Sequence, residues 1–208
     1  SQNSAIAGLT RSSILTGGVE LRIDTRDDVW NPRSGIFLRN AYSGGDKRFT
    51  TVTGESVTDF LQRIEVDAGY FHEIRARTIV AVSLHGRELT GDELDVSDLY
   101  RIGGANTLRG YEPDRWRGES MLLGNAEYRK RINDSLTAVG FLDVGSAYGG
   151  VFETVVPGFK IPATDQSFEP HVGVGAGLRV ITPIGPIRLD MGFGEEGSQA
   201  HFSFGHTF

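Results

Sequence analysis

The chain has 208 residues, with 28 Gly, 7 Pro and no Cys, and its formal net charge at pH 7 is −6. An acidic balance argues against a nucleic-acid binder, because phosphate binding needs a basic surface, and a chain without Cys has no disulfides, thiolate metal sites or Cys nucleophiles. The high Gly content disfavours a helical protein, and no apolar run of about 18 residues predicts a transmembrane helix.

Apolar and polar residues alternate with a period of two through most of the sequence. A strand shows successive side chains to opposite faces, so this alternation predicts amphipathic β-strands. The apolar residues are mostly Val, Ile, Leu, Phe and Tyr, and the opposite positions carry charges of both signs with Gly between them. The predicted strands lie at 17–26, 34–45, 58–73, 76–89, 119–132, 135–149, 171–182, 186–195 and 199–208.

The connections between these strands differ in length in a regular order. The predicted joints at 27–33, 74–75, 133–134 and 183–185 are short, whereas those at 46–57, 90–118, 150–170 and, weakly, 195–198 are longer. Outer-membrane barrels alternate in this way, because their periplasmic turns are tight and their extracellular loops are extended.

The last strand allows two interpretations. Counting back from Phe208 in steps of two gives His206, Phe204, Phe202 and Ala200 on one face, against small and polar residues on the other. In a soluble β-sandwich such an apolar face covers a core, and in a membrane barrel it faces lipid. The mixed charges that recur strand after strand favour a wet lumen, and therefore an all-β, antiparallel transmembrane β-barrel.

One loop motif gives the sequence a family resemblance. Residues 103–111 read Gly-Gly-Ala-Asn-Thr-Leu-Arg-Gly-Tyr and resemble the Gly-Gly…(Val/Leu)-Arg-Gly-(Tyr/Phe) hallmark of the BamA/TamA superfamily of outer-membrane assembly and translocation barrels. Further segments resemble the family's strands in the family's order: Asp24-Thr-Arg-Asp27, Asn31-Pro-Arg-Ser-Gly35, Asn125-Ala-Glu-Tyr128, Gly140-Phe-Leu-Asp-Val-Gly145, Gly175-Ala-Gly-Leu-Arg179, Thr182-Pro-Ile-Gly-Pro-Ile-Arg188 and the closing Phe204-Gly-His-Thr-Phe208.

The resemblance implies a barrel larger than this chain. The family barrel has about sixteen strands, whereas about eight or nine are predicted here, so the chain resembles the carboxy-terminal half of such a barrel. An open sheet edge cannot face lipid, because unpaired backbone groups are costly there. Three interpretations remain open: a fragment of a longer protein, a shortened barrel that closes on itself, and two copies paired edge to edge. No signal peptide is recognisable, which predicts a mature chain or a piece of a longer one.

The resemblance also assigns roles to residues. We expect the hallmark loop, 90–118, to fold into the lumen, where Arg109 would pair with Glu127 and Asp143 on the two following strands; the alternative is an arginine on a surface loop without a fixed partner. The remaining hallmark residues are expected to form tight turns and to pack against the barrel wall: Gly103, Gly104, Leu108, Gly110 and Tyr111. Arg188 and Asp190, with Arg179 opposite, could extend this lumen network or be solvated barrel charges.

The closing strand, 199–208, resembles the family's targeting signal, carried here by Phe202, Phe204, Gly205 and Phe208. We therefore expect a lead-in over 1–16 followed by one barrel domain over 17–208.

The resemblance implies a non-enzymatic barrel that inserts or translocates outer-membrane proteins in a Gram-negative or organellar outer membrane. Its expected partners are membrane lipids and outer-membrane protein substrates, with a second copy or the missing barrel half as alternatives for closing the barrel; no nucleic acid, cofactor or metal is expected. The alternatives are a membrane anchor or secretion pore for a fused passenger, such as a patatin-like lipase, and a small structural barrel of about eight strands. The run from Gly173 to Gly177 lies within a predicted strand, so close packing explains it better than nucleotide binding.

Overall fold

The computed structural model describes residues 12–50, 56–91, 94, 97–156, 159–165, 167–182 and 185–204. Strands and the turns between them make up these ranges, and no helix in them is long and apolar enough to cross a membrane. The strands are β1 (Ser12–Asp24), β2 (Gly35–Thr50), β3 (Ser56–Arg75), β4 (Thr78–Thr90), β5 (Tyr100–Ile102), β6 (Trp116–Gly118), β7 (Ser120–Arg131), β8 (Leu136–Tyr148), β9 (Val151–Val156), β10 (Phe159–Asp165), β11 (His171–Thr182), β12 (Gly185–Gly194) and β13 (Gly197–Phe204).

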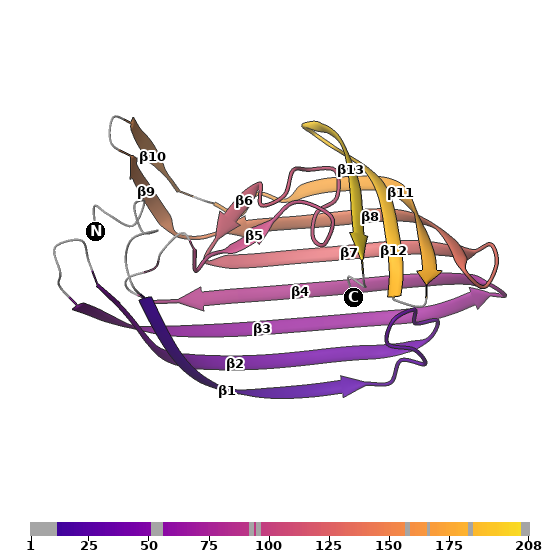
Figure 1. The fold of residues 1–208 in the computed structure, drawn as a ribbon, viewed down its shortest axis with the longest axis horizontal. Helices are drawn as coiled ribbons and strands as arrows, with labels where there is room; N and C mark the ends of the chain where they lie inside the picture. Colours follow the sequence, from indigo (N-terminus) through magenta and orange to yellow (C-terminus); the bar gives the residue numbers. More distant parts are fainter. Residues whose placement is uncertain are drawn as a thin grey trace.

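Nine of these strands form one curved antiparallel sheet in the order β1-β2-β3-β4-β7-β8-β11-β12-β13 (Figure 1). The pairing follows the chain, with each strand beside the next except where β5–β6 and β9–β10 intervene as separate two-stranded ribbons. All nine strands predicted from periodicity are present, which confirms the all-β antiparallel fold. The sheet is open: within the described residues β1 and β13 are edge strands, and each has a neighbour on one side only.

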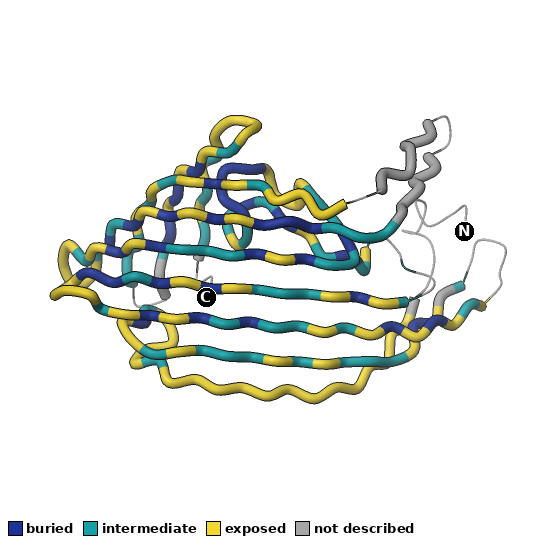
Figure 2. Tube along the Cα trace, turned by 180° about the vertical axis from the view of Figure 1, so that it is seen from behind, coloured by how far each residue is buried: buried dark blue, intermediate teal, exposed yellow. Residues whose placement is uncertain are grey.

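The alternation of the sequence becomes a two-faced sheet (Figure 2). Residues that face outward from the convex side are largely apolar and exposed, and the opposite positions are buried along the central strands. The exposed apolar side chains include Val19, Leu21, Ile23, Ile36, Tyr42, Ile64, Tyr70, Val82, Leu84, Leu122, Tyr128, Leu142, Val144, Val174, Leu178, Leu189, Met191, Phe193 and Phe202. Such a belt suits lipid, as the barrel prediction requires.

The concave side is less polar than the sequence pattern suggested. Phe71, Ile79, Leu123 and Phe141 point inward and are at most 6% exposed. For Leu123 and Phe141 the physical reason is the hallmark loop, which lies in the trough of the sheet between β7–β8 and the returning β11–β13 (Figure 1). Leu123 packs in the apolar cluster of the loop, and the Arg109 guanidinium stacks on Phe141, so both side chains are kept from water.

The connections differ from the prediction in three places. The hallmark loop contains the β5–β6 ribbon, and the 150–170 connection contains the β9–β10 ribbon; neither pair was predicted. The longer connection expected at 195–198 is wrong, because β12 and β13 are joined by a tight turn at Glu195 and Glu196. Gly197 follows that turn with a φ of 131°, a conformation that side chains disfavour.

Two boundaries also moved. β1 begins at Ser12, inside the segment expected to be a lead-in, and β2 and β3 extend to Thr50 and from Ser56, so that they shorten the connection predicted at 46–57. Long strands that run past the membrane core account for both, since hairpins can extend beyond the bilayer without losing backbone pairing.

Candidate functional site

The hallmark loop reaches the lumen because glycines set its backbone. Gly103, Gly104 and Gly110 have φ values of 117°, 94° and 103°, in a region that L side chains rarely adopt. The Thr107 hydroxyl accepts a hydrogen bond from the Gly103 backbone N–H at 2.9 Å and donates to the Gly103 carbonyl at 3.0 Å. The turn around Gly103–Thr107 thereby projects Leu108 and Arg109 toward the sheet.

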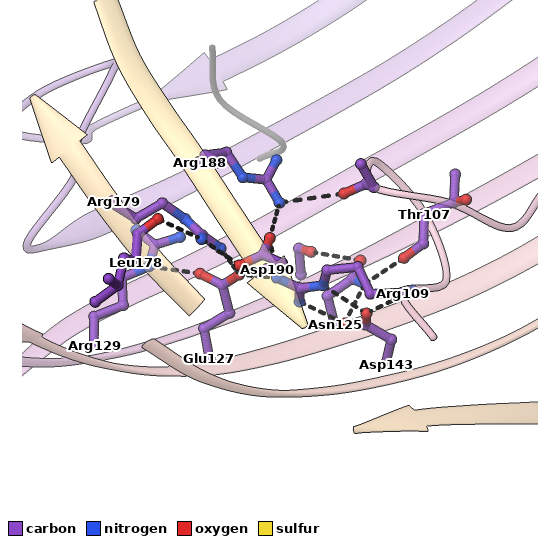
Figure 3. Close-up of polar contacts among 12 residues, drawn as sticks. Thr107, Arg109, Asn125, Glu127, Arg129, Asp143, Leu178, Arg179, Arg188 and Asp190 are labelled. Carbon is purple, nitrogen blue, oxygen red and sulfur yellow. Dashed lines mark hydrogen bonds and ion pairs between the residues drawn. The ribbon is translucent and has the colours of Figure 1, made fainter. Parts of the chain in front are cut away.

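Arg109 meets the two carboxylates that the resemblance assigned to it (Figure 3). Its Nε donates to Asp143 Oδ2 at 2.7 Å, its Nη2 donates to Asp143 Oδ1 at 2.7 Å, and its Nη1 donates to Glu127 Oε1 at 2.6 Å. The backbone N–H of Arg109 adds a fourth bond, 3.1 Å long, to Asp143 Oδ2. A bidentate fork of this kind fixes orientation as well as charge.

Burial makes this contact unlike a surface ion pair. The side chains of Arg109, Glu127 and Asp143 are 3%, 1% and 0% exposed. The guanidinium also stacks on Phe141, with its central carbon 3.6 Å from the ring centroid. A charge buried this far is stable only while its partners remain in place.

The cluster extends from the loop to four strands of the sheet, and we call it the Arg109 network. It comprises Arg109, Asn125, Glu127, Arg129, Asp143, Arg179, Arg188 and Asp190. Arg179 bridges Asp190 and Glu127, at 2.5 Å and 3.2 Å, and Arg188 Nη2 donates to Asp190 Oδ2 at 3.1 Å. Arg179, Arg188 and Asp190 thus belong to the lumen network that the sequence left as one of two options.

Sequence reasoning missed Asn125, Phe141 and Arg129. Asn125 Nδ2 donates to Asp143 Oδ1 at 2.8 Å and to the Thr107 carbonyl at 3.1 Å, so it ties the strand to the loop backbone. The available signal was position, because Asn125 shares a strand face with Glu127 at a spacing of two, as Phe141 does with Asp143.

Tyr111 packs on the barrel wall. It is 1% exposed, donates its hydroxyl hydrogen to the Val172 carbonyl at 2.8 Å, and accepts from the Glu195 backbone N–H at 3.1 Å. Its ring lies edge-on to Trp116, 4.8 Å between centroids, in an apolar cluster with Ile102, Leu108, Met121, Leu123 and Ala147. The hallmark Leu108, at 0% exposed, is part of that cluster.

Glycines of β11 and β12 form the floor under the loop. A Cβ on Gly192 would meet the Gly110 backbone nitrogen within 3 Å, and one on Gly173 would meet the Arg109 carbonyl oxygen. A Cβ on Gly194 would strike the Tyr111 ring. Close packing therefore explains the glycines of β11, as the sequence analysis inferred, and the same holds for β12.

A second ion network lies on the inward side of β1–β4. Arg39 donates to Glu20, Glu65 and Asp67 at 2.8, 2.8 and 2.9 Å, and its side chain is 26% exposed. Asp67 also accepts from Arg87 and lies 2.7 Å from His85 Nδ1.

His85 connects the two networks. Its Nε2 lies 3.2 Å from Ser83 Oγ, which donates to Asn125 Oδ1 at 3.4 Å. Ser83 is 2% exposed, so its hydroxyl is not accessible to a substrate. Among the residues that the structure describes, no group of three or more acidic or histidine side chains is placed to hold a metal ion.

An exposed ion pair joins the loop to the last hairpin. Arg115, in the loop before β6, donates to Glu196 in the β12–β13 turn, with a shortest contact of 2.5 Å. This hydrogen bond holds the pKa of the Glu196 carboxyl below its ordinary value. Both side chains are 44% exposed, so the pair is a weak latch beside the buried Arg109 network.

Of the closing-strand residues, only Phe202 is fully described. It is 59% exposed and faces outward, opposite Leu189 of β12. Phe204 ends β13, and Gly205 and Phe208 lie outside the described residues.

Comparison with known proteins adds independent findings. A family model described as the Omp85 superfamily domain matches residues 7–208. The chain is 31% identical over 125 residues to the chloroplastic outer envelope protein 80 of Arabidopsis thaliana, and 33% identical over 115 residues to the protein of that name from Oryza sativa subsp. japonica. These stretches cover 59% and 52% of this chain and 16% of each relative.

Among solved structures, the chain is similar to BamA from Haemophilus ducreyi lacking POTRA domains 1-3. The TM-score is 0.66 at 11% sequence identity, over 90% of this chain and 40% of that one. At that identity the likeness concerns the fold, and the chain spans well under half of the length of the proteins it matches.

Proposed function

The chain belongs to the Omp85 superfamily and is an outer-membrane β-barrel chain, and on that premise we propose that it inserts or translocates β-barrel proteins without chemical catalysis. The observation that carries the proposal is the Arg109 network, in which a loop is tied into the lumen by a buried arginine on two carboxylates. An ordinary structural barrel has no need for a loop fixed in this way.

The sheet edge at β13 is the proposed site at which a substrate strand pairs. β13 pairs with β12 on one side and, within the described residues, has no strand on its other side. An edge in lipid must find a partner, because each unpaired backbone group there costs several kcal/mol. An edge pairing can be exchanged for the strand of a substrate by β-augmentation.

The closing-strand residues fit this mechanism as its recognition element. Phe202 presents its ring on the lipid side of the edge, and we propose that Phe204, Gly205 and Phe208 belong to the same signal. The loop would hold β7, β8, β11 and β12 rigid, so that movement is confined to the edge.

The test is an insertion assay on the full-length protein reconstituted in vesicles. Arg109→Ala should abolish insertion of an outer-membrane barrel substrate, whereas Arg115→Ala, which removes an exposed arginine of the same loop, should retain it. Heat-modifiable electrophoretic mobility reports whether each variant has folded.

Arg109→Lys separates charge from geometry. Lysine keeps the positive charge but cannot form the bidentate hydrogen bonds of the guanidinium, so insertion should fall to an intermediate level. A folded Arg109→Ala barrel that inserts substrate at the wild-type rate would sink the proposal and favour a structural barrel.

A further inference from the structure

One lysine stands on the lipid-facing side of the sheet, at the end where the turns are short. In β7, Arg129 points inward and is 4% exposed, whereas Tyr128 and Lys130 belong to the outward, exposed set. The outward positions that precede it in β7 are Tyr128, Ala126, Gly124 and Leu122, so an ammonium group here lies at the margin of the apolar belt.

The ammonium is held in place by the next strand. Lys130 lies opposite Thr78 in the β4–β7 ladder, and its Nζ donates to Thr78 Oγ1 at 3.0 Å. Thr78 is 2% exposed. An ammonium has three N–H donors, so two remain for a ligand on the exposed side.

Aromatic residues of β3 and β7 share the outward face with this lysine. Tyr128 pairs with Val80, and Val80 pairs with His72, so these residues form the nearest ladder row to that of Lys130 on the same face of the sheet, with His72 two strands away from the lysine. Tyr128 is 54% exposed, and the His72 ring stacks on Tyr70 with centroids 6.1 Å apart. Exposed tyrosine rings collect at the depth of lipid headgroups.

The two adjacent turns give this end a positive charge. Apart from the buried Arg129, the charged residues of 73–78 and 129–135 are Glu73, Arg75, Arg77, Lys130, Arg131 and Asp134, four basic against two acidic. The turns are fastened together, because the Arg131 N–H donates to the Arg77 carbonyl at 2.9 Å and Arg77 Nη1 donates to the Ile132 carbonyl at 3.3 Å. This local excess of positive charge stands out in a chain whose formal net charge is −6.

We propose that Lys130, held by Thr78 and with Tyr128 two residues before it on the same strand face, binds the headgroup phosphate of an anionic phospholipid. The acyl chains would lie on the apolar belt of β3, β4 and β7, and the basic turns at the right of Figure 1 would attract the negative charge. The occupant is a membrane lipid because the lysine sits on the outward face, where lipid is the solvent.

The experiment uses the full-length chain folded in detergent with equal amounts of phosphatidylglycerol and phosphatidylcholine, followed by native mass spectrometry. The wild type should retain one phosphatidylglycerol in preference to phosphatidylcholine. Lys130→Gln should reduce this preference about fivefold. Lys160→Gln removes the same charge from β10, a ribbon at the opposite end of the barrel, and should leave the preference unchanged.

Two further variants keep the test decisive if Lys130→Gln fails to fold. Lys130→Arg should preserve the preference, and Thr78→Val, which frees the ammonium, should weaken it. Excess glycerol phosphate should not displace the bound lipid, because it lacks acyl chains. Equal retention by the wild type and Lys130→Gln, or an equal loss in Lys160→Gln, would overturn the proposal, as would displacement by glycerol phosphate or by a soluble acidic peptide.

Discussion

The two lumen networks use the same chemistry in different surroundings. Arg109 and Arg39 each place one guanidinium against carboxylates on neighbouring strands. The side chain of Arg109, which belongs to the hallmark loop, is 3% exposed, whereas that of Arg39, on the open side near β1, is 26% exposed. The two networks differ in solvent access, because the hallmark loop excludes water from the Arg109 network and leaves the Arg39 network accessible to water.

This difference has an energetic meaning. In water-filled surroundings an ion pair gains little, because both charges are already solvated. Where water is excluded, the loss of one partner leaves a lone buried charge, which is strongly unfavourable. The loop therefore turns an ordinary barrel ion pair into an element on which the local structure depends.

The sharpest test compares the two arginines directly. Arg109→Ala should lower the free energy of unfolding by about 3 to 5 kcal/mol, because it leaves Glu127 and Asp143 buried without their main partner. Arg39→Ala should cost about 1 kcal/mol. Denaturant unfolding of the folded barrel in detergent, followed by tryptophan fluorescence, measures both; equal losses would contradict the role given to the hallmark loop.

A smaller effect is expected from disturbing the floor under the loop. Gly192→Ala puts a methyl group against the Gly110 backbone and should cost about 1 to 3 kcal/mol by forcing the loop away from β12. Gly140→Ala is the matched control, since a Cβ on this outward glycine meets nothing within 4 Å, and its cost should stay within about 0.5 kcal/mol. The same unfolding assay measures both variants. Equal losses of stability would contradict the role given to the contact between the β12 glycines and the loop.

The smallest effect concerns the exposed latch between Arg115 and Glu196. Since the folded-state pKa of Glu196 is lowered, the contact stabilises the protein above the ordinary glutamate pKa and is lost as pH falls through the folded-state value. The stability difference between the wild type and Glu196→Gln should therefore be present at neutral pH and vanish in acid. Glu195→Gln, in the same turn, serves as the control; a difference that persists in acid would argue against the latch.

The sequence predicted the strands well because each has one dry face and one wet face, and a period of two follows directly from that arrangement. It also predicted that Glu127 and Asp143 share the inward face. The β5–β6 ribbon was not predicted because three-residue segments such as Tyr100–Ile102 are too short to show a period. The β9–β10 ribbon was not predicted because the residues of Val151–Val156 do not alternate strictly and Pro162 interrupts Phe159–Asp165. Phe141 was unpredictable for a different reason: an inward aromatic in a wet lumen makes sense only once the loop covers it.

The position of the loop in the chain has a consequence for the order of folding. Arg109 is separated from Glu127 by 18 residues and from Asp143 by 34, whereas Tyr111 is separated from Glu195 by 84. The entropic cost of closing the chain for the last contact exceeds that for the first by about 1.4 kcal/mol, so the contacts with β7 and β8 are the less costly to form. We therefore expect the loop to attach to β7 and β8 before the glycines of β12 pack against it, so that the final hairpin forms on a loop already in place.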